Sequence, residues 1–466
     1  MTIVTPGIVP ASALDLARPA WLDAFARFAA GLRFEDLPGD AVARAKLVLL
    51  DSLGAIAAGM AEPEMAALVG RLAGEGDAAV IGAGRRAPAT VAAFLNGTAG
   101  TMLELDEGNQ YARGHPGIHV VPALLAQAVR GKVDGRRALL ALCLGYEIGA
   151  RIGIASKLRV TLHPHGTWGT VGAALAVAAL QGAPAETLAQ TINVASSLGL
   201  GTSRRTMLEG GTVRNAYAGV SNQLGLIAAD LALSGFSGEA DGVGTVYGSI
   251  LATDFQPEAM TEGLGERWEI ARNYFKRHAA CRYTHAALDA LSDIVAQAGG
   301  PVTPDDVAAF EVDTYVWAAQ LDHPRPGNML AAKFSLPFAL ATSLAHGGAT
   351  IEAFRDAARG DPTIQALAAR VMVREDPDLT ARLPGLRPAR VRLTLRDGRT
   401  FAAEALTNRG DTEDPYPPEE IARKFHEIAD PVWGSQRGQA IRAMVGGLES
   451  LDDLSALDAL LAEPLR

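Results

Sequence analysis

Acids and histidines lie among mostly apolar or small residues in 101–122, TMLELDEGNQYARGHPGIHVVP, and two carboxylates and one imidazole of this run are singled out here. These groups belong to Glu104, Asp106 and His115. A buried carboxylate costs free energy unless it is paired or used. The glycines and prolines of the run predict a bent loop. We therefore interpret it as a catalytic loop; the alternative is a helix end whose acids face water.

A second polar stretch begins at His163, in HPHGTWGTVGAALAVAALQG, residues 163–182. Its first residues predict a turn that leads into an alanine-rich helix, which Thr167 or Thr170 is expected to cap. The start of such a helix offers N–H groups and a positive dipole end to an anion. The alternative is a structural histidine in a tight turn.

Three arginines surround a glycine pair in GTSRRTMLEGGTVRNAYAG, residues 201–219. They are Arg204, Arg205 and Arg214. A guanidinium beside a glycine loop suits bidentate capture of a carboxylate. The alternative is a set of surface arginines on a loop.

A basic cluster precedes an apolar helix in NYFKRHAACRYTHAALDAL, residues 273–291. It contains Lys276, Cys281, Arg282, Tyr283 and His285. A cationic cluster at a domain boundary can serve an anionic ligand in the cleft. A lysine or cysteine there could also have a shifted pKa and take part in proton transfer. The alternative is a solvated linker.

Apolar residues recur at helical spacing through most of the first 235 residues and again in the tail. Within these helices Asp51 needs a partner, and Glu147 and Arg151 stand four apart, as in a structural salt bridge. The expected helices cover 13–33, 39–60, 63–75, 87–102, 119–130, 137–156, 163–182, most of 183–235, 283–299, 331–346 and much of 417–466.

Alternating, strand-like patterns appear after about residue 265, at 310–318, 371–376 and 389–405. The last of these contains Asp397-Gly398, a strong hairpin signal. We predict a mainly α protein with an α+β insertion. A large helical domain would comprise 1–267 and 404–466, and a smaller α/β lid domain 268–403.

Composition narrows the class of protein. The chain has 466 residues, of which 48% are hydrophobic and 20% charged, which is typical of a globular protein. Its net charge of −10 argues against nucleic-acid binding. Cys143 and Cys281 are the two cysteines, too few for a disulfide scaffold or an ordinary iron–sulfur cluster.

Several sequence signals are missing. We expect no helical zinc site of HxxxH or HExxH spacing, and we find no nucleotide-binding glycine fingerprint and no GxSxG elbow. The N-terminus lacks a signal-peptide pattern, and no charge-free apolar run reaches the length of a membrane span. We therefore expect a cytoplasmic protein with no membrane partner.

The polar stretches together resemble one family. The segments AAFLNGTAGTMLELDEGN, GHPGIHVVPALLA, HPHGTWGTVGAALA, EGGTVRNAYAG and FKRHAACRYTHAALDAL, in this order, resemble the MmgE/PrpD family. LDSLGAIAAG and AKFSLPFALA extend the likeness over nearly the whole chain. The family includes 2-methylcitrate dehydratases, cis-aconitate decarboxylase and iminodisuccinate epimerase. The resemblance implies a helical domain with an inserted lid, a homodimer, and no metal or organic cofactor.

The resemblance also implies site residues. Glu104 and Asp106 match two acids of the family's first loop, and His115 its histidine. The loop's threonine position falls near Asn109. His163 matches the histidine of the second motif.

The chain departs from the family pattern at three places. Lys276 matches the junction lysine, but Cys281 replaces the histidine that follows it. The lysine of the third motif is absent, with Arg214 nearby, and Phe338 replaces the lid tyrosine. These replacements disfavour decarboxylation of cis-aconitate.

We therefore predict a cofactor-independent hydro-lyase that abstracts an α-proton from a small di- or tricarboxylate such as 2-methylcitrate. Alternatives are an epimerase of an iminodisuccinate-like substrate, with Cys281 opposite His115 or His163, and a carboxylate-binding relative without catalysis. The predicted catalytic residues are Asp106, His115, His163, Lys276 and Cys281. The predicted substrate-binding residues are Glu104, Asn109, Thr167, Arg214, Arg282, Tyr283, His285 and Phe338.

Overall fold

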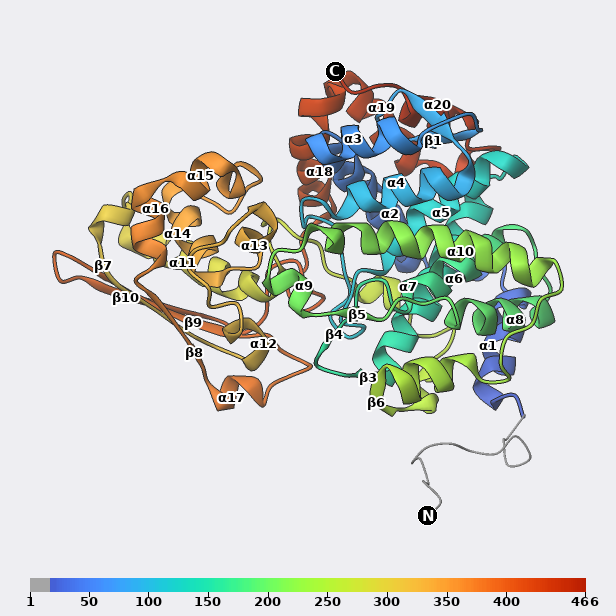
Figure 1. The fold of residues 1–466 in the computed structure, drawn as a ribbon, viewed down its shortest axis with the longest axis horizontal. Coiled ribbons are helices and arrows are strands. Elements are labelled where there is room, and N and C mark those ends of the chain that lie inside the picture. The colour runs from blue at the N-terminus through green and yellow to red at the C-terminus, as the bar shows by residue number, and fades with distance from the viewer. Residues whose placement is uncertain (1–16) are drawn as a thin grey trace, which may run out of the picture.

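A large helical domain and a smaller sheet-containing lid lie side by side in the computed structural model, which describes residues 17–466 (Figure 1). The predicted mainly α fold with an α+β insertion is confirmed. The helix predicted at 39–60 coincides with α2, whereas the start of the one predicted at 13–33 lies outside the described residues. The helices of the first part are α1 (Ala20–Gly31), α2 (Gly39–Met60), α3 (Pro63–Leu72), α4 (Ala89–Thr101), α5 (Pro116–Gly131), α6 (Gly135–Ala155), α7 (Gly169–Leu180), α8 (Ala185–Ser196), α9 (Arg205–Leu208) and α10 (Tyr217–Leu233).

The centre of the helical domain is formed by α4, α5, α6, α7 and α10. Small residues let these helices approach closely: a Cβ on Gly145 of α6 would lie 2.6 Å from the carbonyl oxygen of Gly172 on α7. By length and composition α6 could cross a membrane, but 89% of its most apolar window is buried in the fold. Its Glu147 and Arg151 form the predicted salt bridge, 2.6 Å long.

The C-terminal helices return to the helical domain, where α18 and α19 pack on α2 (Figure 1). Lys424 of α18 provides the partner that Asp51 required, with its Nζ 2.6 Å from Asp51 Oδ1. The same Nζ donates to the carbonyl oxygen of Leu105 at 2.5 Å. The tail therefore holds the polar loop that follows α4. Its helices are α18 (Pro418–Trp433), α19 (Ser435–Gly446) and α20 (Ser455–Ala462).

The lid is built on one four-stranded sheet with the order β10-β9-β7-β8. β7 and β8 are parallel, and the other pairs are antiparallel. The predicted hairpin is present, with Gly398 at φ 88° in its turn. α11 packs on β9 and β10, and α14 packs on β8. The strands are β7 (Val307–Thr314), β8 (Val371–Glu375), β9 (Ala389–Leu395) and β10 (Thr400–Ala405). The helices are α11 (His285–Ala298), α12 (Val316–Ala319), α13 (Met329–Lys333), α14 (Leu336–His346), α15 (Asp356–Gly360), α16 (Pro362–Ala368) and α17 (Pro377–Thr380).

Three short strand pairs pin loops of the helical domain. β1 (Ala78–Val80) pairs with β2 (Arg85–Ala87), and β3 (Ser156–Leu158) pairs with β6 (Ala252–Phe255). β4 (Leu162–His163) pairs with β5 (Thr202–Ser203). The last pair joins the turn at His163 to the arginine-rich loop, two stretches that are about 40 residues apart in the sequence.

Candidate active site

A small cavity of about 60 Å³ brings the four polar stretches together between the helical domain and the lid. Its wall combines cations, histidines and aromatic rings. The lining residues are Glu104, Arg113, Gly114, His115, His163, Pro164, His165, Arg204, Met207, Arg214, Tyr274, Cys281, Arg282, Tyr283, Phe334 and Arg387. Seven predicted site residues are among them: Glu104, His115, His163, Arg214, Cys281, Arg282 and Tyr283.

The loop after α4 is fixed by backbone hydrogen bonds to the junction segment, the basic stretch 273–291 between the two domains. Gly108 N donates to Tyr274 O at 3.1 Å, and Tyr274 N donates to Gly108 O at 2.7 Å. A Cβ at residue 108 would collide with the Tyr274 hydroxyl, so only glycine permits this approach. Glu104 adopts φ 55°, a left-handed conformation that is unusual for a non-glycine residue and often found at functional sites.

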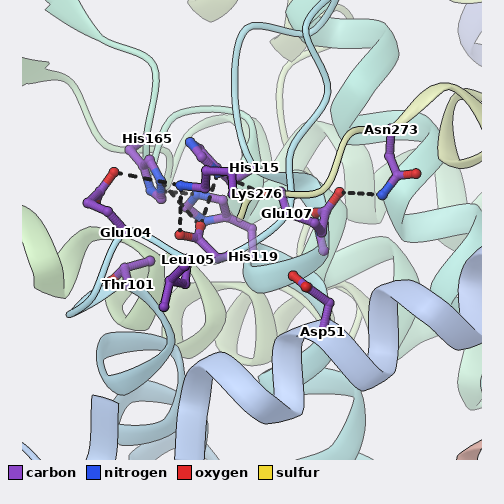
Figure 2. Close-up of polar contacts among 12 residues, drawn as sticks. Asp51, Thr101, Glu104, Leu105, Glu107, His115, His119, His165, Asn273 and Lys276 are labelled. Carbon is purple, nitrogen blue, oxygen red and sulfur yellow. Dashed lines mark hydrogen bonds and ion pairs between the residues drawn. The ribbon is translucent and has the colours of Figure 1, made fainter. Parts of the chain in front are cut away.

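Asp106 lies beneath the cavity wall, fully buried among positive groups. Its carboxylate is 3.1 Å from His115 Nδ1 and 3.5 Å from Lys276 Nζ. Figure 2 shows this cluster, in which His115, His165 and Lys276 converge above α2. Burial raises the pKa of Asp106, but the hydrogen bond from His115 and the charges of Lys276 and Arg214 outweigh burial and hold that pKa well below its usual range. Asp106 is therefore a fixed anion.

The ring of His115 is oriented by two acceptors on one side. Its Nδ1 lies 2.7 Å from the carbonyl oxygen of Glu107 as well as 3.1 Å from Asp106 Oδ2. Both neighbours accept, so Nδ1 carries a proton and Nε2 is left to accept one from the cavity. This is the arrangement of a general base supported by a carboxylate.

His163 has the opposite polarity. Its Nδ1 accepts a hydrogen bond of 3.0 Å from the backbone N–H of His165. Burial lowers the pKa of His163 well below its usual range, and Arg214 and Arg204 lower it further. The ring is therefore neutral near pH 7, with its proton on Nε2, and can donate a hydrogen bond to a bound anion.

Two histidines extend this cluster into the protein. His165 Nδ1 is 3.0 Å from His119 Nε2, and His165 Nε2 is 3.9 Å from Asp106 Oδ2. The ring of His165 lies 4.6 Å from that of His115. Burial lowers the pKa of His119 to about 3, so this ring is neutral. His165 therefore packs against the base and is held from behind by His119.

Cys281 faces the cavity at the junction of the two domains. Burial and the nearby Glu104 raise the pKa of its thiol to about 11. The thiol is consequently protonated near pH 7, which favours an acid role over a base role. Arg282 beside it is anchored, because its Nη2 donates to Asp411 Oδ1 at 2.5 Å and its guanidinium lies over the Tyr274 ring.

Glu104 compensates several cations at once. It forms an ion pair with Arg214, and its Oε2 is 3.8 Å from Lys276 Nζ. Burial lowers the pKa of Lys333, from α13 of the lid, to about 7, although Glu104 opposes that shift. Lys276 and Lys333 are both buried behind the lining residues. The structure thus places the predicted catalytic Lys276 as a partner of the two acids and not at the wall.

Four predicted substrate contacts lie away from the cavity wall. Asn109 closes the loop by bonding Ala112 N and Glu269 O, and Thr167 donates to Pro164 O at 2.6 Å. His285 accepts from Arg282, and Phe338 packs on Phe354. Their side chains are committed to local structure, so we assign positioning roles to the first three and a core role to Phe338.

The predicted helix cap is wrong. α7 begins at Gly169 with Trp168 at the N-cap position, and no side chain caps it. Thr167 uses its hydroxyl within the preceding turn, and Thr170 Oγ1 is buried without a partner.

One group of side chains could in principle hold a metal ion. The ligand atoms of Asp106, His115 and His165 lie within 4.8 Å of one another. The expectation that no HxxxH spacing occurs is wrong, because His115 and His119 have it. However, Lys276 Nζ already neutralises the same carboxylate at 3.5 Å, and a dication there would be repelled. The donor set fits an ion poorly.

Sequence reasoning missed several lining residues. His165 lies in the HPHGT turn and lines the cavity together with His163, but the sequence pattern predicted only His163 as a site residue. Tyr274 lies in the basic stretch 273–291 but was not among the predicted site residues, and Arg387, from the segment before β9, had no local signal. Their positions depend on how the lid packs on the helical domain.

Comparison with known proteins agrees with this architecture. The MmgE/PrpD N-terminal domain matches residues 23–254, and the MmgE/PrpD C-terminal domain matches residues 278–450. A cis-aconitate decarboxylase of Aspergillus terreus is 25% identical over 94% of this chain and 95% of its own. The cis-aconitate decarboxylase of Homo sapiens is 25% identical, with 95% and 94% covered. The cis-aconitate decarboxylase-like protein oryM of Aspergillus oryzae is 26% identical, with 93% and 95% covered. The chain therefore belongs to the MmgE/PrpD family.

Proposed function

We propose that this enzyme is a cofactor-independent hydro-lyase that removes the α-proton of a small di- or tricarboxylate such as 2-methylcitrate. The observation that carries the proposal is the orientation of His115. Asp106 and the Glu107 carbonyl hold its Nδ1, which leaves Nε2 as a base at the cavity.

The first step is proton transfer from the substrate's α-carbon to His115 Nε2. The electrons of the C–H bond move into the adjacent carboxylate, which becomes an enediolate. Arg214 and Arg282 line the cavity and stabilise this added charge. His163 donates a hydrogen bond through Nε2.

The second step expels the hydroxyl group of the neighbouring carbon. The electron pair of the enediolate forms the carbon–carbon double bond, and the C–O bond breaks. The protonated Cys281 thiol supplies the proton, so that water leaves and a thiolate remains. Proton return from His115 to Cys281 through solvent restores the enzyme.

An epimerase is the second candidate function. It is favoured by the presence of one imidazole base and one protonated thiol in the same cavity. His115 would take the proton from one face of the carbon, and Cys281 would return one to the other face. This reaction needs no leaving group.

Proton NMR in deuterated water separates the candidates. The enzyme is incubated with 2-methylcitrate, citrate, iminodisuccinate and cis-aconitate, the last because the relatives carry its name. Loss of water with one hydroxy acid supports the hydro-lyase, and α-proton exchange without net loss supports the epimerase. Loss of carbon dioxide from cis-aconitate, or no exchange with any compound, contradicts both.

A cysteine pair tests the acid. We expect Cys281→Ser to slow turnover strongly, because a hydroxyl is a weaker acid than a thiol. Cys143→Ser is the matched control, since Cys143 is also buried and reduced but lies in α6 away from the cavity. Equal rates for both variants would remove Cys281 from the mechanism.

A further inference from the structure

Five arginines line the cavity, and four of them already have acceptors. Arg214 pairs with Glu104, Arg282 with Asp411, Arg387 donates to Gln110 O at 2.7 Å, and Arg113 donates to Gly153 O at 2.8 Å. Arg204 differs: among the described residues its side chain has no ion pair and no hydrogen bond. Its Nε and Nη2 are buried without a partner.

Backbone hydrogen bonds hold Arg204 beside the turn that begins at His163. Arg204 N donates to Thr161 O at 2.8 Å, and the β4–β5 pairing places Thr202 opposite His163. The guanidinium lies 5.8 Å from the ring centre of Tyr283, and that of Arg387 lies 5.6 Å from the same ring. Helical domain and lid thus each contribute one guanidinium near one tyrosine.

A second, outer cavity meets the first at this point. Both cavities are lined by Arg113, Pro164, Arg204 and Tyr283. The outer one continues past Arg159 and Trp317 to Val160, which is 73% exposed. Arg204 therefore stands at the neck between solvent and the catalytic groups.

Charge at the neck is positive, although the whole chain has a net charge of −10. The outer cavity is lined by Arg113, Arg159 and Arg204 and by no acid. The inner one has a single lining acid, Glu104, which Arg214 neutralises. Donors that are buried without an acceptor cost free energy, and an anionic ligand that bonds to them offsets that cost.

We propose that Arg204, together with Tyr283, forms a subsite for the carboxylate of the substrate that does not react. This inference rests on the proposed function and adds to it, because it requires a ligand with at least two carboxylates. One carboxylate lies among Arg214, Arg282 and His163, and the other lies at the neck. The planar guanidinium of Arg204 binds it through two parallel hydrogen bonds.

The subsite is tested by binding, independently of turnover. Succinate and butyrate have four carbons each, but butyrate has a methyl group in place of one carboxylate. We measure both by calorimetry on the wild type, R204Q and R204K. R204Q should weaken succinate binding about 10- to 100-fold and leave butyrate binding unchanged. R204K should lie between, since lysine keeps the charge without the fork.

The neighbouring Arg205 provides a matched control. Its side chain is 81% exposed and paired with Glu209, so R205Q should bind succinate as the wild type does. If turnover is found, R204Q should raise KM and change kcat less than about threefold. An unchanged succinate affinity in R204Q, an equal loss for butyrate, or no succinate binding by the wild type at millimolar concentration would overturn the subsite. A failure of proton exchange alone would overturn only the proposed reaction.

Discussion

The deep wall of the cavity and its neck use charge in opposite ways. At the deep end of the cavity, the carboxylates of Asp106 and Glu104 have cationic partners: Lys276 lies 3.5 Å from Asp106 behind the wall, and Arg214 pairs with Glu104 at the wall. At the neck, Arg204 keeps its guanidinium free of protein acceptors. Prearranged charge suits a chemical step, which gains from groups that need not reorganise. An uncompensated cation suits recognition, because the ligand supplies the missing partner.

The two regions also differ in how they are supported. The wall is held by the junction segment through Tyr274 and by the C-terminal helix through Lys424. The neck is held by the short β4–β5 pair and by an aromatic ring. Changes at the wall should therefore affect rate, changes in its supports should affect stability, and changes at the neck should affect affinity.

The largest expected effect on rate comes from removing the base. His115→Asn should lower turnover by about 10³-fold or more, because it removes the proton acceptor. The melting temperature should stay close to that of the wild type, since the imidazole is at the cavity surface. Rates from the NMR assay and a thermal melt check both statements. Full activity of this variant would show that His115 is not the base.

The support of the wall from outside can be broken at Lys424. Lys424→Met leaves Asp51 buried without its partner and removes the donor to Leu105. Loss of one member of a buried ion pair costs about 3–5 kcal/mol of unfolding free energy. Urea unfolding measures this cost. Arg423→Met is the control, because Arg423 is next in sequence and 61% exposed; a similar loss there would show that the pair is not special.

The histidine cluster should make stability depend on pH. Burial lowers the pKa of His119 to about 3 in the folded protein, while the unfolded chain binds a proton near pH 6.5. The unfolded state therefore binds more protons as the pH falls below 6.5, and folding stability decreases. The contribution of one such histidine is about 1.4 kcal/mol per pH unit. Urea unfolding of His119→Gln should show a shallower slope than the wild type, with the difference approaching this amount only below about pH 5.5. An identical slope would contradict the prediction.

The smallest expected effect concerns metals. Chelators should leave activity unchanged, and added Zn²⁺ or Mn²⁺ should not raise it. The reason is that the ammonium group of Lys276 already neutralises the carboxylate of Asp106. Inactivation by a chelator, with recovery on adding metal, would instead assign Asp106, His115 and His165 to an ion. Activity assays after dialysis decide the matter.

Local patterns predicted local structure well. The period of α2 and the Asp-Gly turn of the β9–β10 hairpin depend on neighbouring residues, and both are where the sequence indicates. His115, His163 and Cys281 each belong to a stretch of unusual polarity, which marked them as site residues in the sequence, and all three line the cavity. His285 shares such a stretch, but the start of α11 turns it toward Arg282 and away from the wall.

Contacts between distant segments could not be read from these patterns. Lys424 and Asp51 are 373 residues apart, and the sequence around either residue contains no signal that the two form a pair. Arg387 and Arg204 meet at Tyr283 only after the lid packs on the helical domain. Both His163 and His165 line the cavity. Their position there depends on the pairing of β4 with β5, which joins segments that are distant in the sequence.

The bond between Lys424 and Leu105 has a consequence for biosynthesis. The two residues are 319 positions apart, so the ribosome completes the catalytic loop and the whole lid before the lysine that holds the loop. A nascent chain that stops before α18 would carry all the proposed catalytic residues without the support beneath them. The enzyme should therefore become active late in translation, and chains truncated before Lys424 should be inactive even where the lid has folded.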